Sequence, residues 1–401
     1  MSAPKSYRPI SLLETLSKCL EKIIAARILF KVGKHNLLPY TQFGGRDNLS
    51  CVNAGLSLSH DIHAAWAQGK FASLLTLDIS GYFNNVNHAR LSFTLRRLGF
   101  SDCMCNWLTS YFSDRTAQFR INDHVTNLFP ISNVGIPQGS PLSPVLSSLY
   151  SIPVLLLVLD SPSLSVRAYV DDFTILATSN SHARNIHLLE EAAEEASLCL
   201  QALGLDFELE KCKLIHFAKS GQSLKDNPPI NIPRPTGVAH RVFATTTTIR
   251  WLGFFLDRRL DFKDHVKKCA IKGLSVISGL KLLANIVHGL SVAHARILFK
   301  ACVLPILTYG SAIWYRGTRQ NGLIKPLVKA QNVGLQWLLG AFQTSPLAPL
   351  NTLPQSHPCT SPWPDYQETP PPASPRFLLV RKSPNVSPAI GTLTTPTAPT
   401  A

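Results

Sequence analysis

The stretch SVRAYVDDFTILA, residues 165–177, places two adjacent aspartates between two mostly apolar runs. These runs predict strands at 165–169 and 173–178, with the acids at the tip of a hairpin. Two neighbouring carboxylates that both stay ionised repel each other, so a fold that gathers them normally neutralises them with a divalent cation or with basic groups. A solvated Asp-Asp turn is the alternative interpretation.

A third carboxylate stands in a matching setting and favours the metal site. Asp78 ends the apolar run ASLLTL, residues 72–77, and a polar turn and a helix from near Asn87 follow it. Mg²⁺ is usually held by a few carboxylates, with waters and substrate phosphates completing its coordination. Two such ions about 4 Å apart can activate an attacking hydroxyl and stabilise a leaving phosphate. The predicted reaction class is phosphoryl transfer.

A loop rich in glycine and proline lies between these acids. It reads GIPQGSPLSP, residues 135–144, and precedes the apolar segment from Val145 to Leu159. Such a loop allows another backbone to approach closely. An ordinary turn before a helix, with Ser140 as its cap and Pro141 in its first turn, is the alternative.

Three motifs follow one another along the chain: an aspartate at a strand end with Phe83 five residues later, a Pro-Gln-Gly loop, and a Tyr-Val-Asp-Asp hairpin. Together, and in this order, they closely resemble the motifs of reverse transcriptases. The resemblance covers residues 7 to about 343. It is closest to the polymerases of non-LTR, LINE-type retrotransposons, the jockey-like and fungal Tad-like elements especially. Residues 7–27 and 42–46 resemble the two opening blocks of that family, and residues 203–211 resemble its lysine-bearing motif.

The resemblance implies a role for each matched residue. Asp78 and Asp171, with Asp172 beside them, would be the catalytic carboxylates and hold two Mg²⁺ ions, with Mn²⁺ as a substitute. Phe83 would be a steric gate that collides with a ribose 2′-hydroxyl. Arg46 would bind the triphosphate, and Gln138 and Gly139 would contact the nucleotide and the template strand. Lys211 would supply charge or a proton to the leaving pyrophosphate. The primer grip would lie at Trp251, Leu252 and Gly253.

Three of these positions also have a structural interpretation. Phe83 could be a core aromatic, and Arg46 and Lys211 could be solvated surface charges. One position departs from the family, whose members usually read Asp after the gate aromatic. Here Phe83 is followed by Asn84, which puts the effect of this position on activity in doubt and leaves the three core acids intact.

Composition agrees with a nucleic-acid partner. The 401 residues carry 39 Lys and Arg against 24 Asp and Glu, a formal net charge of +15, which attracts phosphate backbones. The implied partners are an RNA template, a DNA primer and dNTPs. The nine cysteines contain no Cys-x-x-Cys pair, so a zinc knuckle is not expected.

The expected fold class is α+β, a right-hand polymerase fold with helical fingers, a palm built on an antiparallel sheet, and a helical thumb. The expected divisions are fingers at 1–70, palm at 71–256 and thumb at 257–342. Further strands are predicted at 72–78, 116–121, 212–217 and 249–256, and helical spacing occurs at 13–28 and 188–200. Residues 343–401 contain 14 of the 29 prolines and are predicted to be a disordered tail.

No secretory leader is evident, and the apolar segment 145–159 contains serines and Pro153 and is short for a membrane span. A core helix, no membrane and an intracellular location are therefore expected, with the nucleus implied by the resemblance. The family match fades after Phe342, which suggests a frameshifted or truncated element copy. Two rivals remain: another palm polymerase, such as an intron maturase or a viral RNA-dependent RNA polymerase, and an inactive remnant that only binds nucleic acid.

Overall fold

A computed structural model describes residues 10–46, 48–131, 133–157, 161–219, 226–232, 240–245, 247–282, 289–317, 321–342 and 344–345. These residues all lie in the unit Met1–Pro358, the first of two into which the chain divides. The Pro-rich tail predicted from residue 343 lies outside the described residues, apart from Thr344 and Ser345. The first three residues of the opening motif, Tyr7 to Pro9, also lie outside them.

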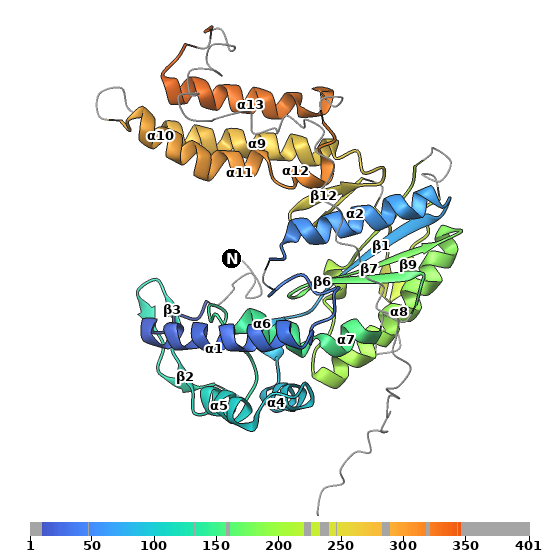
Figure 1. The fold of residues 1–401 in the computed structure, drawn as a ribbon, viewed down its shortest axis with the longest axis vertical. Coiled ribbons are helices and arrows are strands. Elements are labelled where there is room, and N and C mark those ends of the chain that lie inside the picture. Colours follow the sequence, from blue (N-terminus) through green and yellow to red (C-terminus); the bar gives the residue numbers. More distant parts are fainter. Residues whose placement is uncertain are drawn as a thin grey trace, which may run out of the picture. The chain divides into compact units, whose positions relative to one another are not determined.

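Four antiparallel strands form the central sheet, in the order β6-β7-β1-β8 (Figure 1). Their bounds are β1 Phe71–Asp78, β6 Leu164–Tyr169, β7 Asp172–Ser179 and β8 Lys213–Phe217. Each coincides with a strand predicted from the apolar runs. β1 lies in the middle and is buried along most of its length, which explains why its sequence is continuously apolar rather than alternating.

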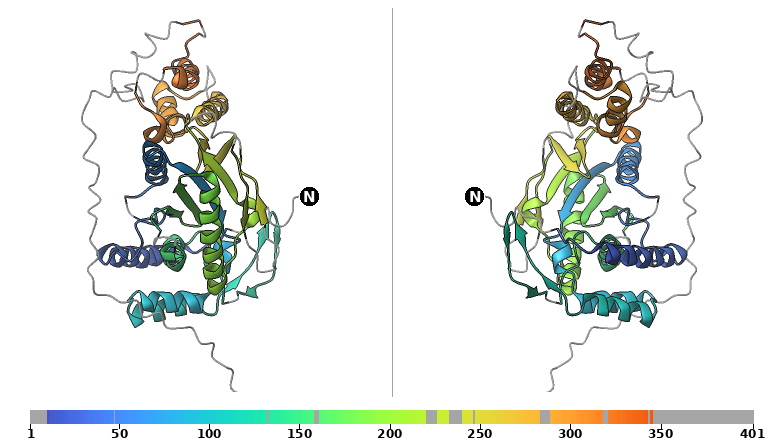
Figure 2. Two further views of the ribbon diagram at one scale, coloured as in Figure 1. Left: turned by 90° about the vertical axis from the view of Figure 1, so that its right-hand side faces the viewer. Right: turned by 90° about the vertical axis from the view of Figure 1, so that its left-hand side faces the viewer.

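One helix packs on each face of this sheet. Side chains alternate between the two faces of a strand. Ser165 and Arg167 of β6 therefore share one face, where they contact α2 (Cys51–Ala67). Ser73 of β1 lies on the other face and contacts α8 (His182–Leu203). Figure 2 shows the sheet between these helices, and the predicted helical spacing at 188–200 corresponds to the buried side of α8.

The remaining core is helical. α1 (Thr15–Lys34), the short α3 (Tyr82–Asn85), α4 (His88–Arg97) and α5 (Asp102–Phe112) pack with α6 (Ser143–Tyr150) and α7 (Ile152–Leu157). The single helix predicted from Val145 to Leu159 is therefore wrong. Two helices meet at Ser151, because Pro153 has no N–H to continue the α6 ladder and suits the start of a new helix. The segment is nevertheless core, as expected, since Val145, Leu149 and Leu155 are buried.

Two segments that were each predicted as one strand contain two strands in the structure. The segment 116–121 contains β2 (Thr116–Ala117) and β3 (Arg120–Ile121), which pair with β5 (Phe129–Pro130) and β4 (His124–Val125). The segment 249–256 is a hairpin of β11 (Thr248–Trp251) and β12 (Phe254–Asp257). Leu252 and Gly253 turn the chain there with φ of 46° and 83°. Two short strands that the sequence did not predict, β9 (Ile230–Ile232) and β10 (His240–Val242), form a further pair.

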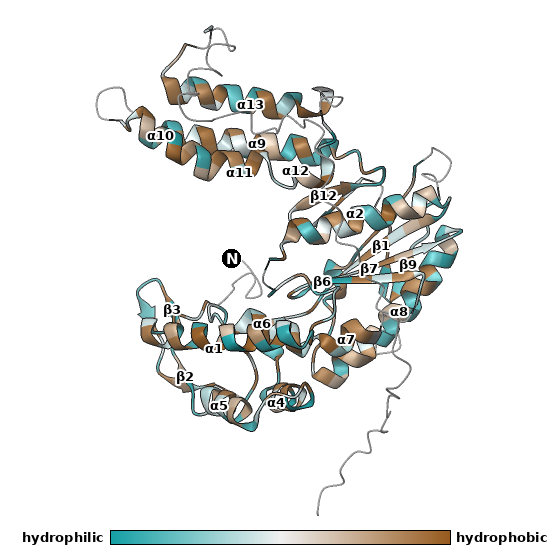
Figure 3. Ribbon diagram, in the orientation of Figure 1, coloured by the Kyte–Doolittle hydropathy of each residue, from teal (hydrophilic) through white to brown (hydrophobic). Residues whose placement is uncertain are grey.

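The described residues after β12 are mostly helical, as predicted for this region. They form α9 (Lys263–Lys281), α10 (Val292–Leu298), the π-helix η4 (Phe299–Val303), α11 (Leu304–Leu307), α12 (Ser311–Trp314) and α13 (Asn321–Leu339). Within the described part of the chain, Val292–Trp314 is the one helical stretch long and apolar enough to cross a membrane by length and composition, with 33% of its most apolar window buried. Core helices of soluble proteins meet the same criterion. Figure 3 shows the apolar character of α10 and α11.

Candidate active site

The three predicted carboxylates gather at one end of the sheet. Asp78, the last residue of β1, is the register partner of Asp172, the first residue of β7. Tyr169 pairs with Asp172 on the other side, so Val170 and Asp171 form a two-residue hairpin turn. Directly opposed Cα atoms in antiparallel strands lie about 4.5–5.5 Å apart. Asp78 and Asp172 therefore occupy neighbouring backbone positions, and the third acid, Asp171, immediately precedes Asp172 in the chain.

The hairpin turn holds an unfavourable backbone conformation. Val170 has a φ of 61°, which is rare for a β-branched residue. The loop before α2 packs directly on this turn: a Cβ on Gly44 would lie 2.5 Å from the Val170 nitrogen, and the Phe43 N–H donates to the Ala168 carbonyl at 2.9 Å. The surrounding fold therefore fixes the position of Asp171, as is common for strained turns at functional sites.

Lys211 lies at the carboxylate end of the sheet. It ends the 3₁₀ turn Leu209–Lys211, and its Nζ donates to Asp78 Oδ2 at 3.0 Å and to Glu208 Oε2 at 2.6 Å. The hydrogen bond from Lys211 to Glu208 is the largest cause of a raised Lys211 pKa, followed by the one to Asp78. The ammonium group therefore stays charged beside Asp78 and supplies a positive charge where a cation would be needed.

Glu208 is a site residue that the sequence analysis missed. The Glu208 N–H donates to the Asp78 carbonyl at 2.8 Å, and the Ser80 N–H donates to the Asp206 carbonyl at 2.9 Å. These two backbone hydrogen bonds attach the segment before Lys211 to the end of β1. The i,i+3 spacing of Glu208 and Lys211 was the available sequence signal, because such residues share one side of a helical turn.

The segment after Asp78 places two aromatic rings side by side. Tyr82 is buried, and its hydroxyl donates to the Ser147 carbonyl at 2.5 Å. Burial raises the Tyr82 pKa, and the nearby Asp171 charge adds to that shift, so Tyr82 lies within the electrostatic reach of the hairpin acid. Phe83 is partly buried against the core, with its ring centroid 5.9 Å from that of Tyr82. Phe83 is thus partly a packing residue, beside a tyrosine that is influenced by the Asp171 charge.

The Pro-Gln-Gly loop is held closely by the chain's first described residues. The Ser11 N–H donates to the Gln138 carbonyl at 2.7 Å. Gly139 has a φ of 118°, and a Cβ there would lie 2.7 Å from the Ser11 oxygen, so only glycine fits this approach. The Gln138 and Gly139 backbone therefore packs against Ile10 and Ser11, a contact that the sequence did not reveal.

Ser140 contacts a buried acid, and its hydroxyl also accepts a hydrogen bond from the Leu142 N–H at 3.1 Å. α6 begins at Ser143, with Leu142 as its N-cap residue, so the alternative interpretation of Ser140 as that cap is wrong. Its hydroxyl donates to Glu21 Oε2 of α1 at 2.6 Å. Glu21 is 1% exposed, and its other oxygen accepts from Ser17 Oγ at 2.9 Å.

Arg46 belongs to the loop that contacts the hairpin. The loop packs on α6, because a Cβ on Gly45 would lie 2.8 Å from Ser148 Oγ. The Arg46 guanidinium donates to the Pro39 carbonyl at 3.0 Å, and partial burial lowers its pKa.

The predicted primer grip is the turn of the β11–β12 hairpin. Trp251 is buried, and the Leu252 carbonyl accepts a hydrogen bond from the Tyr309 hydroxyl at 2.6 Å. A Cβ on Gly253 would lie 3.0 Å from the same hydroxyl oxygen. The C-terminal helices therefore hold this turn through Tyr309.

The carboxylates at this end of the sheet supply some, but not all, of the ligands that a hard cation needs. Among the residues that the structure describes, no three His, Cys, Asp or Glu side chains are grouped closely enough to hold a metal ion. Asp78 and Asp172 nevertheless supply adjacent carboxylates, and the Lys211 ammonium binds one oxygen of Asp78. One or two carboxylates, completed by waters and substrate phosphates, are the usual protein ligands of Mg²⁺.

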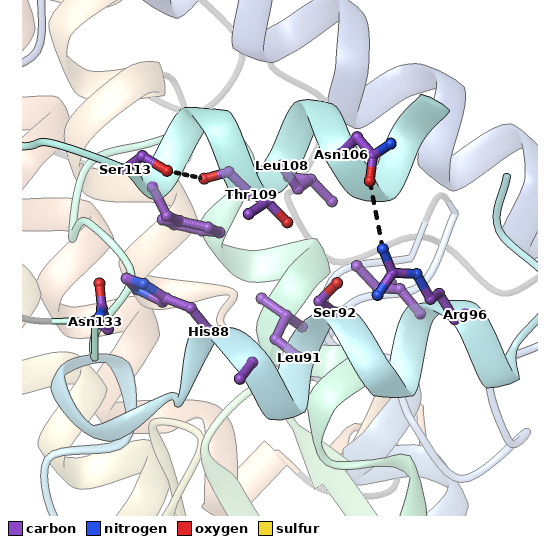
Figure 4. A pocket seen from close by; sticks show the side chains of 12 residues that line it. His88, Leu91, Ser92, Arg96, Asn106, Leu108, Thr109, Ser113 and Asn133 are labelled. Carbon is purple, nitrogen blue, oxygen red and sulfur yellow. Dashed lines mark hydrogen bonds between the residues drawn. The ribbon is translucent and has the colours of Figure 1, made fainter. Parts of the chain in front are cut away.

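Two cavities lie on the side of α4 and α5. One of about 470 Å³ lies between these helices and includes His88, Arg96 and Asn106 (Figure 4). In it, Arg96 donates to Asn106 at 3.3 Å. The other, of about 260 Å³, extends from the neighbourhood of His88 to Gln138 and therefore adjoins the Pro-Gln-Gly loop.

Comparison with known proteins gives one family match. A family profile described as "Reverse transcriptase (RNA-dependent DNA polymerase)" matches residues 2–256. The chain is 28% identical over 324 residues to a probable RNA-directed DNA polymerase from transposon BS of Drosophila melanogaster, covering 80% of this chain and 35% of that protein. It is 26% identical to the RNA-directed DNA polymerase from mobile element jockey of the same species, with 77% and 33% covered.

A third relative is the Pol polyprotein of the type-1 retrotransposable element R1 of Bradysia coprophila, 26% identical, with 79% of this chain and 30% of that protein covered. The chain thus spans about a third of the length of these relatives. Among solved structures, apo telomerase from Candida tropicalis aligns with a TM-score of 0.43 at 12% identity, covering 85% of this chain and 57% of that one.

Proposed function

The chain belongs to the reverse transcriptase (RNA-dependent DNA polymerase) family, and from this membership we propose that it is the polymerase domain of a non-LTR retrotransposon. In this role it adds deoxynucleotides to the 3′-hydroxyl of a DNA primer on an RNA template. The catalytic edge comprises Asp78, Asp171, Asp172 and Lys211. The observation that carries the proposal is the pairing of Asp78 with Asp172, with Asp171 in the adjoining turn and Lys211 bound to Asp78.

The described elements can be assigned to a right-hand polymerase fold. In this proposal, the β6-β7-β1-β8 sheet with α2 and α8 is the palm, α1 with its neighbouring helices forms part of the fingers, and the helices after β12 form the thumb. The β11–β12 turn at Leu252 and Gly253 would then be the primer grip, placed where the palm meets the thumb through Tyr309.

The proposed cofactor is a pair of Mg²⁺ ions, held by Asp78 and Asp171 with Asp172 in support. When bound, such ions lower the pKa of the attacking hydroxyl and neutralise charge on the phosphate that departs. The protein's part is to keep these acids at one edge. Opposed strand ends provide two of the positions, and the hairpin turn fixed by Gly44 provides the third. Since Lys211 occupies one oxygen of Asp78, we expect its ammonium group to move toward Glu208 when a metal is bound.

Other residues would bind and orient the substrates. Lys211, charged and adjacent to the acids, is placed to stabilise the leaving pyrophosphate or to protonate it. Arg46, on the loop that packs against the hairpin, offers a guanidinium suited to phosphate oxygens. Phe83 would select deoxyribose by excluding a 2′-hydroxyl. Gln138 and Gly139 would contact the nucleotide and the template strand.

Primer extension by the purified full-length chain tests this function. With an annealed RNA template and DNA primer, dNTPs and Mg²⁺, we expect template-dependent extension. Asp171→Asn should abolish extension while leaving template binding within about fivefold, because the basic surface that drives non-specific binding is retained. Glu194→Gln is the matched control: it removes a carboxylate from an exposed position on α8 and should extend the primer normally.

The possible failures separate the rival functions. Salt-dependent RNA binding without extension under any metal condition would indicate an inactive remnant that only binds nucleic acid. Preferential incorporation of rNTPs would indicate an RNA-dependent RNA polymerase. Normal extension by Asp171→Asn would show that the catalytic carboxylates are elsewhere.

A further inference from the structure

The cavity of about 260 Å³ beside Gln138 has the features of a recognition site for one flat ring. It lies between the β2–β5 region, α4 and the Pro-Gln-Gly loop, and its chemically informative lining residues are Asn84, His88, Arg115, Phe119, Phe129 and Gln138. Its volume is below the roughly 300–1,000 Å³ of pockets for drug-sized ligands. It therefore has room for one heterocycle.

Aromatic rings form two of its walls. Phe119 and Phe129 are stacked, with centroids 5.2 Å apart and planes 27° apart. On another side, His88 and Phe112 stack at 4.2 Å and 17°. Phe119 is 50% exposed, so a large part of this aromatic side chain remains accessible to a ligand. Aromatic faces of this kind stack on nucleobases of any sequence.

The polar groups at the cavity match the edges and the charge of a nucleotide. Asn84 and Gln138 carry amides, which both donate and accept hydrogen bonds. Arg115 provides a positive charge, and its guanidinium carbon lies 5.0 Å from the centre of the Tyr111 ring. No Asp or Glu lines the cavity, so nothing there repels a phosphate. Arginine beside exposed aromatics is the usual combination in single-strand binding grooves.

The cavity is lined by residues of the same two segments that carry Phe83 and the Pro-Gln-Gly loop. Asn84 directly follows the gate residue Phe83, and the Ile136 N–H donates to the Phe83 carbonyl at 2.7 Å. Asn84 and Gln138 therefore belong to the two segments that form the nucleotide site in the proposed function.

From this placement we propose that the cavity binds an unpaired nucleobase of the template strand, just ahead of the base being copied. The base stacks against Phe119, and Arg115 contacts an adjoining phosphate. This proposal rests on the proposed polymerase function for the identity of the strand. It assigns the segment Thr116–Pro130 a role in holding the template before it is copied.

The test measures binding without catalysis, using the full-length chain and RNA–DNA primer–templates with no dNTP present. The template carries 2-aminopurine in its single-stranded 5′ overhang, at one of the first four positions in turn. We expect one position to change fluorescence on binding and an overhang to tighten binding. Stacking of one base on an aromatic ring corresponds to about 5- to 100-fold in affinity, so Phe119→Ala should weaken overhang binding about tenfold and restore the fluorescence at that position.

Phe93→Ala is the matched control. Phe93 is 60% exposed and lies near Arg97, but it is on α4 and does not line the cavity. It should leave both readouts unchanged. Equal effects of Phe119→Ala and Phe93→Ala, or the same affinity with and without an overhang, would overturn the proposal. Because binding is read directly, a chain that binds the overhang through Phe119 but never extends a primer would refute only the polymerase function.

Discussion

The contact between Ser140 and Glu21 gives the sharpest prediction about what holds the Pro-Gln-Gly loop. Glu21 is 1% exposed, and its two carboxylate oxygens accept from Ser140 Oγ at 2.6 Å and from Ser17 Oγ at 2.9 Å. Ser140→Ala removes this donor from a buried carboxylate oxygen, and it also removes the acceptor of the Leu142 N–H at 3.1 Å. Hydrogen bonds to charged groups contribute about 1.5–3 kcal/mol, so we expect Ser140→Ala to lower the free energy of unfolding by about 2 kcal/mol.

Ser143→Ala is the control in the same loop. Its hydroxyl donates to the Pro137 carbonyl at 2.7 Å, which is a neutral acceptor, so its loss should cost only about 0.5–1.5 kcal/mol. Urea unfolding of the full-length variants at one pH measures both values. Glu21→Gln and the double variant complete a cycle, and we expect a coupling of at least about 1 kcal/mol between positions 21 and 140.

The loop should also lose its position relative to the nucleotide. The backbone of Gln138 lies two residues from Ser140, so Ser140→Ala is expected to raise the KM for dNTPs more than it lowers kcat. A Ser140→Ala variant no less stable than Ser143→Ala, with no coupling to Glu21, would show that the short contact does not hold the loop.

Three further predictions concern the gate, the lysine and a buried histidine. Phe83→Ala should raise the ratio of kcat/KM for rNTPs to that for dNTPs, whereas Phe93→Ala should not; an unchanged ratio in an active Phe83 variant would make Phe83 a core aromatic only. Glu208→Gln removes the largest cause of the raised Lys211 pKa, so NMR titration of labelled lysine should give a lower pKa for Lys211, and an unchanged value would contradict the contact. Burial lowers the His216 pKa from its ordinary 6.5, so the unfolded chain takes up the proton first as the pH falls. The contribution of neutral His216 to the free energy of unfolding should therefore be fully present above about pH 6.5 and decrease below it. Between pH 7.5 and 5.5, the free energy of unfolding of a His216→Gln variant should decrease less than that of the parent.

The main sheet could be predicted from sequence because its strands are short apolar runs that end at acids. β1, β6, β7 and β8 each coincide with such a run. The errors arose where periodicity is uninformative. A six-residue run at 116–121 is two pairs of two-residue strands, and the run at 249–256 bends at Leu252 and Gly253. In both runs the chain changes direction at a backbone turn, and the spacing of apolar residues does not indicate where such a turn lies.

The contacts that assemble the site could not be predicted, because they join distant parts of the chain. Ser140 and Glu21 are 119 positions apart, and Lys211 is 133 positions from Asp78. The run at residues 165–177 also contains Arg167, which is 3% exposed and paired with Asp61 of α2. Its partner comes from a helix about a hundred residues earlier, a pairing that the apolar character of the run does not indicate.

The departure at Asn84 can now be placed on a physical basis. An aspartate there, as the family usually has, would put a carboxylate on the cavity that holds Arg115 and no acid. At the proposed catalytic edge, the negative charges of Asp78 and Glu208 are already compensated in part by the Lys211 ammonium group, which contacts both. Loss of an acid at position 84 therefore makes the cavity more favourable for a phosphate without removing any of the three carboxylates at the strand ends. In the proposed function, the substitution at Asn84 therefore bears on how the template is held, whereas the proposed metal ions depend on Asp78, Asp171 and Asp172.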